Sequence, residues 1–80
     1  MPAIINEDGF LVMIMPNDHR PPHVHVFKNS GHARITIGNN EKRPELLEVI
    51  NMKNREILKA MRIVLAHQAK LSEAWSKIHG

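Results

Sequence analysis

Four of the six histidines in this chain fall within fourteen positions, from His19 to His32. Imidazole is the side chain whose charge changes near neutral pH, and it is also a common metal ligand. The segment 17–26 reads N-D-H-R-P-P-H-V-H-V, so that His19, His23 and His25 follow an H-x3-H-x-H spacing. This segment is therefore the first candidate for a functional site.

The alternation of residues around His23 and His25 predicts a β-strand in which both imidazoles share one face, with Cα atoms about 6.6 Å apart. Val24 and Val26 then point to the opposite face. If these valines lie beneath a helix, the polar side chains of the strand and of the next alternating segment, 32–37, gather on the far face of the sheet. That face holds His23, His25, His32, Arg34 and Thr36.

One interpretation of this cluster is a metal site. Neutral imidazole suits zinc and other divalent transition metals, and two side chains at i and i+2 of one strand can converge on one ion. We take His19, His23 and His25 as the ligand set, with Asp18 or His32 as further residues that could complete it.

A second interpretation is RNA binding or cleavage without a metal or other cofactor. Two imidazoles with pKa values near 6.5 can act as general base and general acid, and arginine stabilises the charge that develops on a phosphate. The catalytic candidates are then His23, His25 and His32, and the binding candidates are His19, Arg20 and Arg34.

In a third interpretation the histidines are structural. They would cap turns, satisfy backbone groups and form a polar sheet face that a partner protein covers. The residue pattern alone leaves these three interpretations open.

The rest of the chain predicts a single α+β domain over residues 1–80. Strands are expected at about 10–15, 23–27 and 32–37, and the segment 46–52 fits either a fourth strand or a short helical turn. From Asn54, a plausible N-cap, the apolar period changes to 3.6 and predicts a helix over 54–78. We therefore expect a three- or four-stranded antiparallel meander with one long C-terminal amphipathic helix packed on one sheet face.

The predicted helix is longer than its sheet. Unbroken, it would span about 37 Å, whereas a six-residue strand spans roughly 20 Å. Either it breaks near His67 and Gln68, or its far end, including Trp75, is covered by something else. A second copy of the chain is the simplest cover, so we expect a homo-oligomer such as a dimer.

The composition excludes several classes of protein and of metal site. The 80 residues contain no cysteine, which rules out a disulfide framework and thiolate zinc sites. No apolar run is long enough to cross a membrane, and the first residues lack the basic stretch of a signal peptide, so we expect a cytoplasmic protein. The formal net charge of +3, together with an acid-free stretch from His19 to Asn40, favours an anionic partner.

The chain resembles a family of short bacterial proteins known as domain-of-unknown-function family 4160. The likeness covers nearly the whole chain, from Met1-Pro2-x-Ile4 through the block 17–26 to the helix that ends in Trp75. Members are commonly encoded beside a second small protein, so the resemblance implies a toxin–antitoxin-like module with a cognate protein partner. We therefore expect the His/Arg-rich sheet face to engage RNA or that protein. The family has no assigned catalytic residues to transfer.

Overall fold

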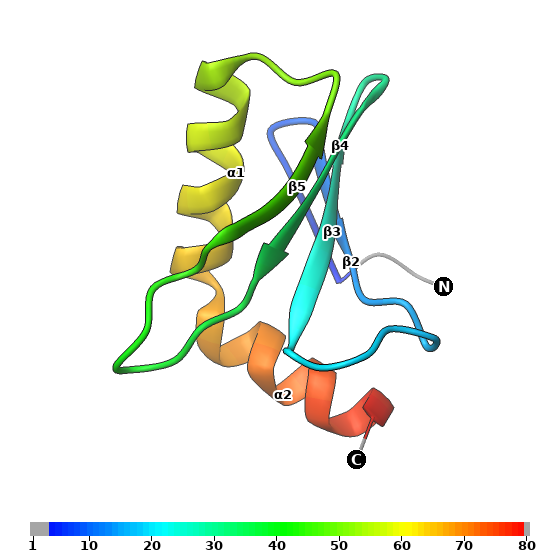
Figure 1. Ribbon diagram of the computed structural model, residues 1–80, viewed down its shortest axis with the longest axis vertical. Helices are drawn as coiled ribbons and strands as arrows, with labels where there is room; N and C mark the ends of the chain where they lie inside the picture. Colours follow the sequence, from blue (N-terminus) through cyan, green and yellow to red (C-terminus); the bar gives the residue numbers. More distant parts are fainter. Residues whose placement is uncertain (1–3, 80) are drawn as a thin grey trace.

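The computed structural model describes residues 4–79, which form one antiparallel sheet followed by two helices (Figure 1). The strands lie side by side in the order of the chain, which makes the sheet a meander. In chain order, the elements are β1 (Ile5–Glu7), β2 (Phe10–Met13), β3 (His23–Lys28), β4 (Gly31–Thr36), β5 (Leu46–Ile50), α1 (Asn54–Ala66) and α2 (Gln68–His79).

The β3–β4 hairpin sets which side chains share a face. Lys28 pairs with Gly31 around the turn Asn29-Ser30, where Asn29 adopts a φ of 54°. In this register His25 lies opposite Arg34, and residues paired across two strands point to the same side of the sheet. The predicted common face of His23, His25, His32, Arg34 and Thr36 is thereby confirmed.

The opposite face of the sheet packs against α1 and forms the hydrophobic core, which α2 closes at the end of the sheet. Val24 and Val26 are fully buried there, as their alternation with the histidines predicts. Because the chain is small, few side chains make up this core and each contributes substantially. Its other members are Ile5, Phe10, Val12, Ile14, Ala33, Ile35, Ile37, Ala60, Ile63, Val64, Leu71 and Trp75.

The sheet differs from the prediction in strand number and length. It has five strands rather than three or four, because the short β1 pairs with β2 and the segment 46–52 contains the strand β5. The strand expected over 10–15 ends at Met13, since the chain then turns at Pro16. The α+β class and the meander are as expected.

The prediction of a single helix over 54–78 is wrong, and of the two alternatives given for it, the structure has the break near His67 and Gln68. His67 leaves the helical geometry with φ −109° and ψ 19°. The side-chain amide of Gln68 donates through Nε2 to the carbonyl of Ile37 at 2.9 Å. The second helix turns beneath the end of the sheet (Figure 1), where Trp75 is only 7% exposed. The N-cap is Lys53 rather than Asn54.

This break removes our reason for expecting a second copy of the chain over Trp75, because the same chain covers that side chain. Homo-oligomerisation itself stays a prediction. Across residues 4–79, no helix is both long and apolar enough to cross a membrane.

Candidate metal centre

A tight turn places the carboxylate of Asp18 beside the sheet. Pro16 presets the backbone for the second position of a β-turn, and the N–H of Asp18 donates to the carbonyl of Met15 at 3.1 Å. The Asp18 side chain folds back and accepts the N–H of Met15 at 3.0 Å. Two hydrogen bonds between the same residues therefore fix both the loop and the direction of its carboxylate.

Two imidazoles from β3 meet this carboxylate. The Nε2 of His25 lies 3.0 Å from Asp18 Oδ1 and 3.1 Å from Oδ2, and the Nε2 of His23 lies 3.5 Å from Oδ1. One potential ligand atom from each of the three residues lies within 4.8 Å of those of the other two. The i, i+2 spacing on the strand brings the two rings together, and the preceding turn supplies the oxygen.

The tautomer of His23 follows from its other nitrogen. Its Nδ1 lies 2.9 Å from the carbonyl oxygen of Pro21, which only accepts hydrogen bonds, so Nδ1 carries the proton. In a neutral ring Nε2 is then an acceptor. That Nε2 is buried and has no hydrogen-bond partner within residues 4–79, although it faces Asp18.

His25 is oriented by a third imidazole. Its Nδ1 lies 3.0 Å from the Nε2 of His32, and the two rings stack with centroids 5.2 Å apart and an interplanar angle of 9°. Burial and the nearby His25 and Arg34 charges lower the pKa of His32, and Glu48 only partly opposes this. A neutral His32 can accept a hydrogen bond from His25 Nδ1. The Nε2 of His25 is then the nitrogen that faces Asp18, and it would have to give up any proton to bind an ion.

The second helix closes the cluster from below. Trp75 packs against the ring of His23 with centroids 5.7 Å apart, and the ring of His79 lies against Trp75 with centroids 4.0 Å apart and a tilt of 33°. The side chains of Asp18, His23 and His25 are consequently no more than 12% exposed. Desolvation raises the pKa of Asp18, but hydrogen bonds from His25 and the Met15 N–H outweigh it and hold that pKa below its usual value.

A family model described as "Domain of unknown function (DUF4160)" matches residues 9–76. The chain belongs to this family. No curated protein and no solved structure gives a significant match. In this DUF4160 domain the matched region includes the turn at Asp18, both β3 histidines, His32 and Trp75, and it ends before His79.

The DUF4160 fold brings together the three catalytic candidates, His23, His25 and His32. It separates them from His19 and Arg20, whereas Arg34 lies opposite His25. His19 and Arg20 are exposed and, together with Asp18, line a hollow of about 410 Å³ next to α2. Arg34 is on the predicted face, but its Nε donates to Glu48 at 3.0 Å.

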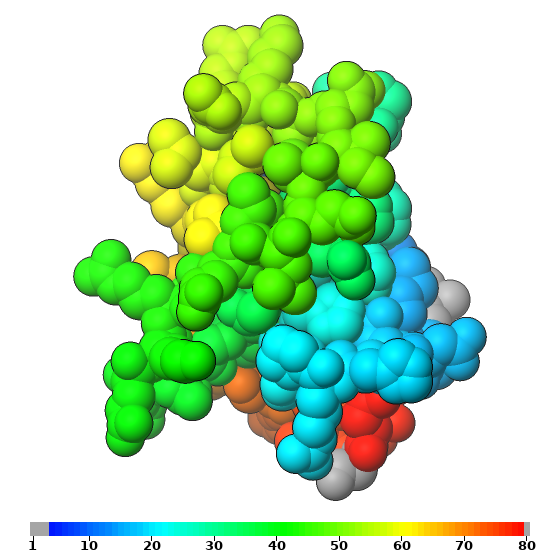
Figure 2. Space-filling view, viewed as in Figure 1, coloured from blue at the N-terminus to red at the C-terminus, as the bar shows by residue number. Residues whose placement is uncertain are grey.

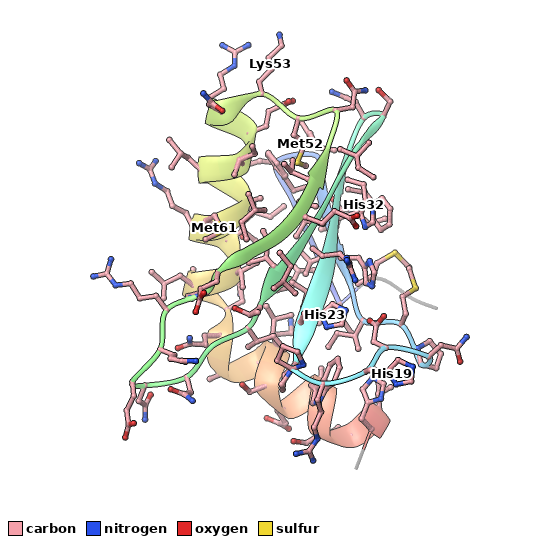
Figure 3. All side chains as sticks on the ribbon, in the orientation of Figure 1. His19, His23, His32, Met52, Lys53 and Met61 are labelled. Atoms are coloured by element: carbon pink, nitrogen blue, oxygen red, sulfur yellow. The ribbon has the colours of Figure 1, made fainter. Side chains whose placement is uncertain are left out.

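His19 is therefore not part of the compact cluster. Asp18 stands beside His23 and His25 in the position that we predicted for His19. Figure 3 shows His19 in the loop near α2, whereas His23 and His32 project from strands. The peptide bond between Arg20 and Pro21, next to His19, is cis. The sequence does carry a signal for Asp18, because Pro16-Asn17-Asp18 marks a turn in which an aspartate commonly bonds the backbone.

Proposed function

We propose that this DUF4160 domain binds one divalent transition metal ion through Asp18, His23 and His25. The observation that carries this proposal is the buried Nε2 of His23. Its opposite nitrogen donates to Pro21, so a neutral ring aims a lone pair at the Asp18 carboxylate. Two acceptors facing each other in a buried site repel, and a cation between them satisfies both.

A protonated His23 is the alternative way to satisfy this pair. A charge-assisted N–H···O contact normally measures about 2.7–2.9 Å. The separation of 3.5 Å between His23 Nε2 and Asp18 Oδ1 is longer than that. It is instead close to the roughly 3.4 Å between ligand atoms that surround a tetrahedral ion at about 2.1 Å.

The donor set indicates the class of metal. Two imidazoles and one carboxylate suit zinc, iron(II), cobalt(II) or nickel(II), whereas magnesium and calcium prefer oxygen ligands. Each histidine also has its other ring nitrogen held, His23 by a carbonyl and His25 by His32. Such outer partners commonly orient metal-bound imidazoles.

Three protein ligands leave coordination positions for water or for a bound molecule, which is typical of reactive rather than closed structural zinc sites. Asp18 belongs to the cluster and also lines the hollow next to α2. His19 and Arg20 line the same hollow, where they would meet an anionic ligand approaching the ion.

The toxin–antitoxin-like role, RNA as ligand and a cognate protein partner stay predictions. We rank metal binding above metal-independent RNA cleavage because His23 is 5% exposed and packs under Trp75. A general base or acid must come within hydrogen-bond reach of the reacting group. A ring covered in this way is poorly placed to reach an RNA backbone.

Isothermal titration of tag-free protein with zinc, cobalt or nickel tests the proposal. We expect one equivalent to bind to the wild type and at least tenfold weaker binding for His23→Ala, His25→Ala and Asp18→Asn. Two controls remove a histidine from other places. His67→Ala loses an imidazole that contacts Glu7, and His19→Ala separates the predicted ligand set from the observed cluster.

Wild-type affinity in both control variants, combined with loss in the three cluster variants, would support the site. Unchanged affinity in the His23→Ala/His25→Ala double variant would refute it. Loss of binding in His19→Ala would return the ligand set to His19, His23 and His25.

A further inference from the structure

We infer that β5 and α1 form a docking surface for an extended, acidic segment of another protein, which would add as a further strand beside β5. This inference is independent of the metal proposal, since none of the three ligand residues lies on this surface. We call it the β5–α1 surface and define it by Leu46, Leu47, Val49 and Ile50 of β5 and by Leu58, Arg62 and Leu65 of α1, with Arg43 and Pro44 beside them.

The first observation is the exposure of β5. This strand pairs only with β4, so its other edge is open. All five of its residues are exposed, and four of them are large apolar side chains, from 38% exposure at Val49 to 54% at Ile50. In Figure 2 the green segment that contains β5 runs uncovered across the front of the molecule.

The edge carries little of the protection that edge strands usually have, namely one charged residue and one register shift. Natural proteins commonly blunt such edges with charges, prolines or bulges that prevent pairing with another chain. The only charged residue of β5 is Glu48, and its carboxylate accepts the Nε–H of Arg34 on the neighbouring strand. A register shift lies between Arg34 and Ile35 of β4, near the start of β5, and the rest of the strand pairs regularly.

The second observation is the apolar stripe on α1. Leu58 and Leu65 are about half exposed and lie seven residues apart, on one side of the helix. Val49 and Leu46 lie opposite Ala33 and Ile35 in the sheet register, so they face the same side as α1. A small hollow of about 160 Å³ lies between α1 and the loop that precedes β5, and its lining includes Pro44, Leu58 and Leu65.

A strand added beside β5 would therefore project every second side chain toward the exposed leucines of α1. Such β-strand addition gains affinity from backbone hydrogen bonds, and its specificity comes from the pockets that receive alternate side chains. The occupant that fits is an extended segment that presents apolar side chains on the face directed toward α1.

Charge decides which kind of segment fits. Arg43 and Arg62 line the hollow, and Arg55 precedes Leu58 on the same side of α1. None of these three arginines forms an ion pair with any residue in the described range 4–79. A second copy placed against β5 would bring the same arginines toward each other, whereas carboxylates on a partner would meet them.

The test uses a capped synthetic peptide of about eight residues, in which valine and glutamate alternate along one face of the strand and threonine fills the other face. A matched peptide has lysine in place of glutamate. Backbone amide shifts of the labelled protein are followed by NMR during titration. We expect the acidic peptide to shift β5 and α1 amides, with weaker binding as salt rises, and the lysine peptide to have no effect. Arg43→Glu/Arg62→Glu should weaken binding at least tenfold.

The matched control is Lys70→Glu/Lys77→Glu, which makes the same charge change on exposed positions of α2 and should leave the affinity unchanged. Equal binding of the two peptides, or shifts confined to residues outside β5 and α1, would overturn the inference. So would a concentration-dependent dimer, detected by sedimentation, that Ile50→Lys abolishes, because the edge would then serve a second copy. Displacement of the acidic peptide by a uridine oligonucleotide at the same residues would likewise favour a nucleic acid.

Discussion

The Nδ1 of His25 lies 3.0 Å from the Nε2 of His32, a residue from the neighbouring strand whose ring stacks on that of His25. This contact fixes the orientation of the His25 ring and directs its Nε2 toward Asp18. His32 is thus a positioning residue of the proposed metal centre, and it would lie beside a bound ion rather than coordinate it.

Loss of this contact should weaken metal binding without removing a ligand. We expect His32→Ala to lower zinc affinity about 10–100-fold, the range typical for outer partners of metal-bound histidine. His32→Gln keeps a side-chain acceptor and should retain more affinity than His32→Ala. Competition with a chromophoric chelator measures both, and wild-type affinity in His32→Ala would show that His32 has no positioning role.

Trp75 gives a second, optical readout of the same centre. It is the only tryptophan of the chain, and its ring lies 5.7 Å from that of His23. Cobalt or nickel bound at the centre should quench its fluorescence and reach a plateau at one equivalent. His23→Ala/His25→Ala protein should show no saturable quenching at that concentration, and identical curves for the two proteins would contradict the placement of the ion.

The same tryptophan stabilises the fold. Trp75 is 7% exposed and belongs to the core, so Trp75→Ala should lower the free energy of unfolding by about 3–5 kcal/mol. Trp75→Phe retains an aromatic ring over His23 and should lose less. Urea unfolding followed by circular dichroism makes the comparison, and a loss below about 1 kcal/mol for the alanine variant would mean that α2 hardly contributes to the core.

An ion pair between Asp8, in the turn from β1 to β2, and Lys59 of α1 should make the stability of the fold depend on pH in the acid range. The hydrogen bond and charge of Lys59, 2.9 Å from the carboxylate, lower the pKa of Asp8 from its ordinary 3.8. The folded state therefore holds a proton on Asp8 less readily than the unfolded state. The stabilisation is fully present above pH 3.8 and is lost as the pH falls through the lower folded value.

We accordingly expect Asp8→Asn to lower the melting temperature slightly at pH 7 and to have less effect at pH 3. The effect is small because both side chains are exposed to solvent. Lys59→Met should reproduce this pH dependence, since it removes the other partner. If the melting temperatures of wild type and Asp8→Asn differ by the same amount at pH 3 and pH 7, the ion pair is not the cause of that difference.

Gly38 tests how the loop after β4 is joined to α2. Its φ of +74° and the nearby carbonyl of Lys42 leave no room for a Cβ atom, and the amide of Gln68 also lies close. Gly9 has a similar φ of +80°, but a Cβ there would meet the flexible end of Lys28. Backbone strain should cost about 1–3 kcal/mol in either alanine variant, and Gly38→Ala should cost more. Equal losses in chemical denaturation would refute the backbone clash.

Much of the sheet could be predicted because local patterns determine it. The alternation of apolar and polar residues in β3 and β4, with Asn29-Ser30-Gly31 between them, specifies both the hairpin and its faces. β1 was missed because only Ile5 of its three residues is buried, so the strand has no periodic signal. Its pairing with β2 supplies the order that its own sequence does not.

The helix break and the third ligand depend on tertiary contacts. Leu71 and Trp75 continue the apolar period past His67, so the pattern also fits an unbroken helix. The bend follows the end of the sheet, where the Gln68 amide meets the Ile37 carbonyl. Likewise, the order of residues in the loop does not tell whether Asp18 or His19 faces β3, which the Met15–Asp18 turn decides.

X-ray absorption spectroscopy of zinc-loaded, tag-free protein can identify the ligands of the proposed metal centre, because imidazole ligands give a recognisable scattering pattern. We expect one equivalent of zinc with two imidazoles and additional oxygen ligands at about 2.0–2.2 Å. His25→Ala should reduce the imidazole count to one, and His19→Ala should leave it at two. A spectrum with no imidazole ligands, or one that the His23→Ala/His25→Ala double variant does not change, would contradict the proposed metal centre.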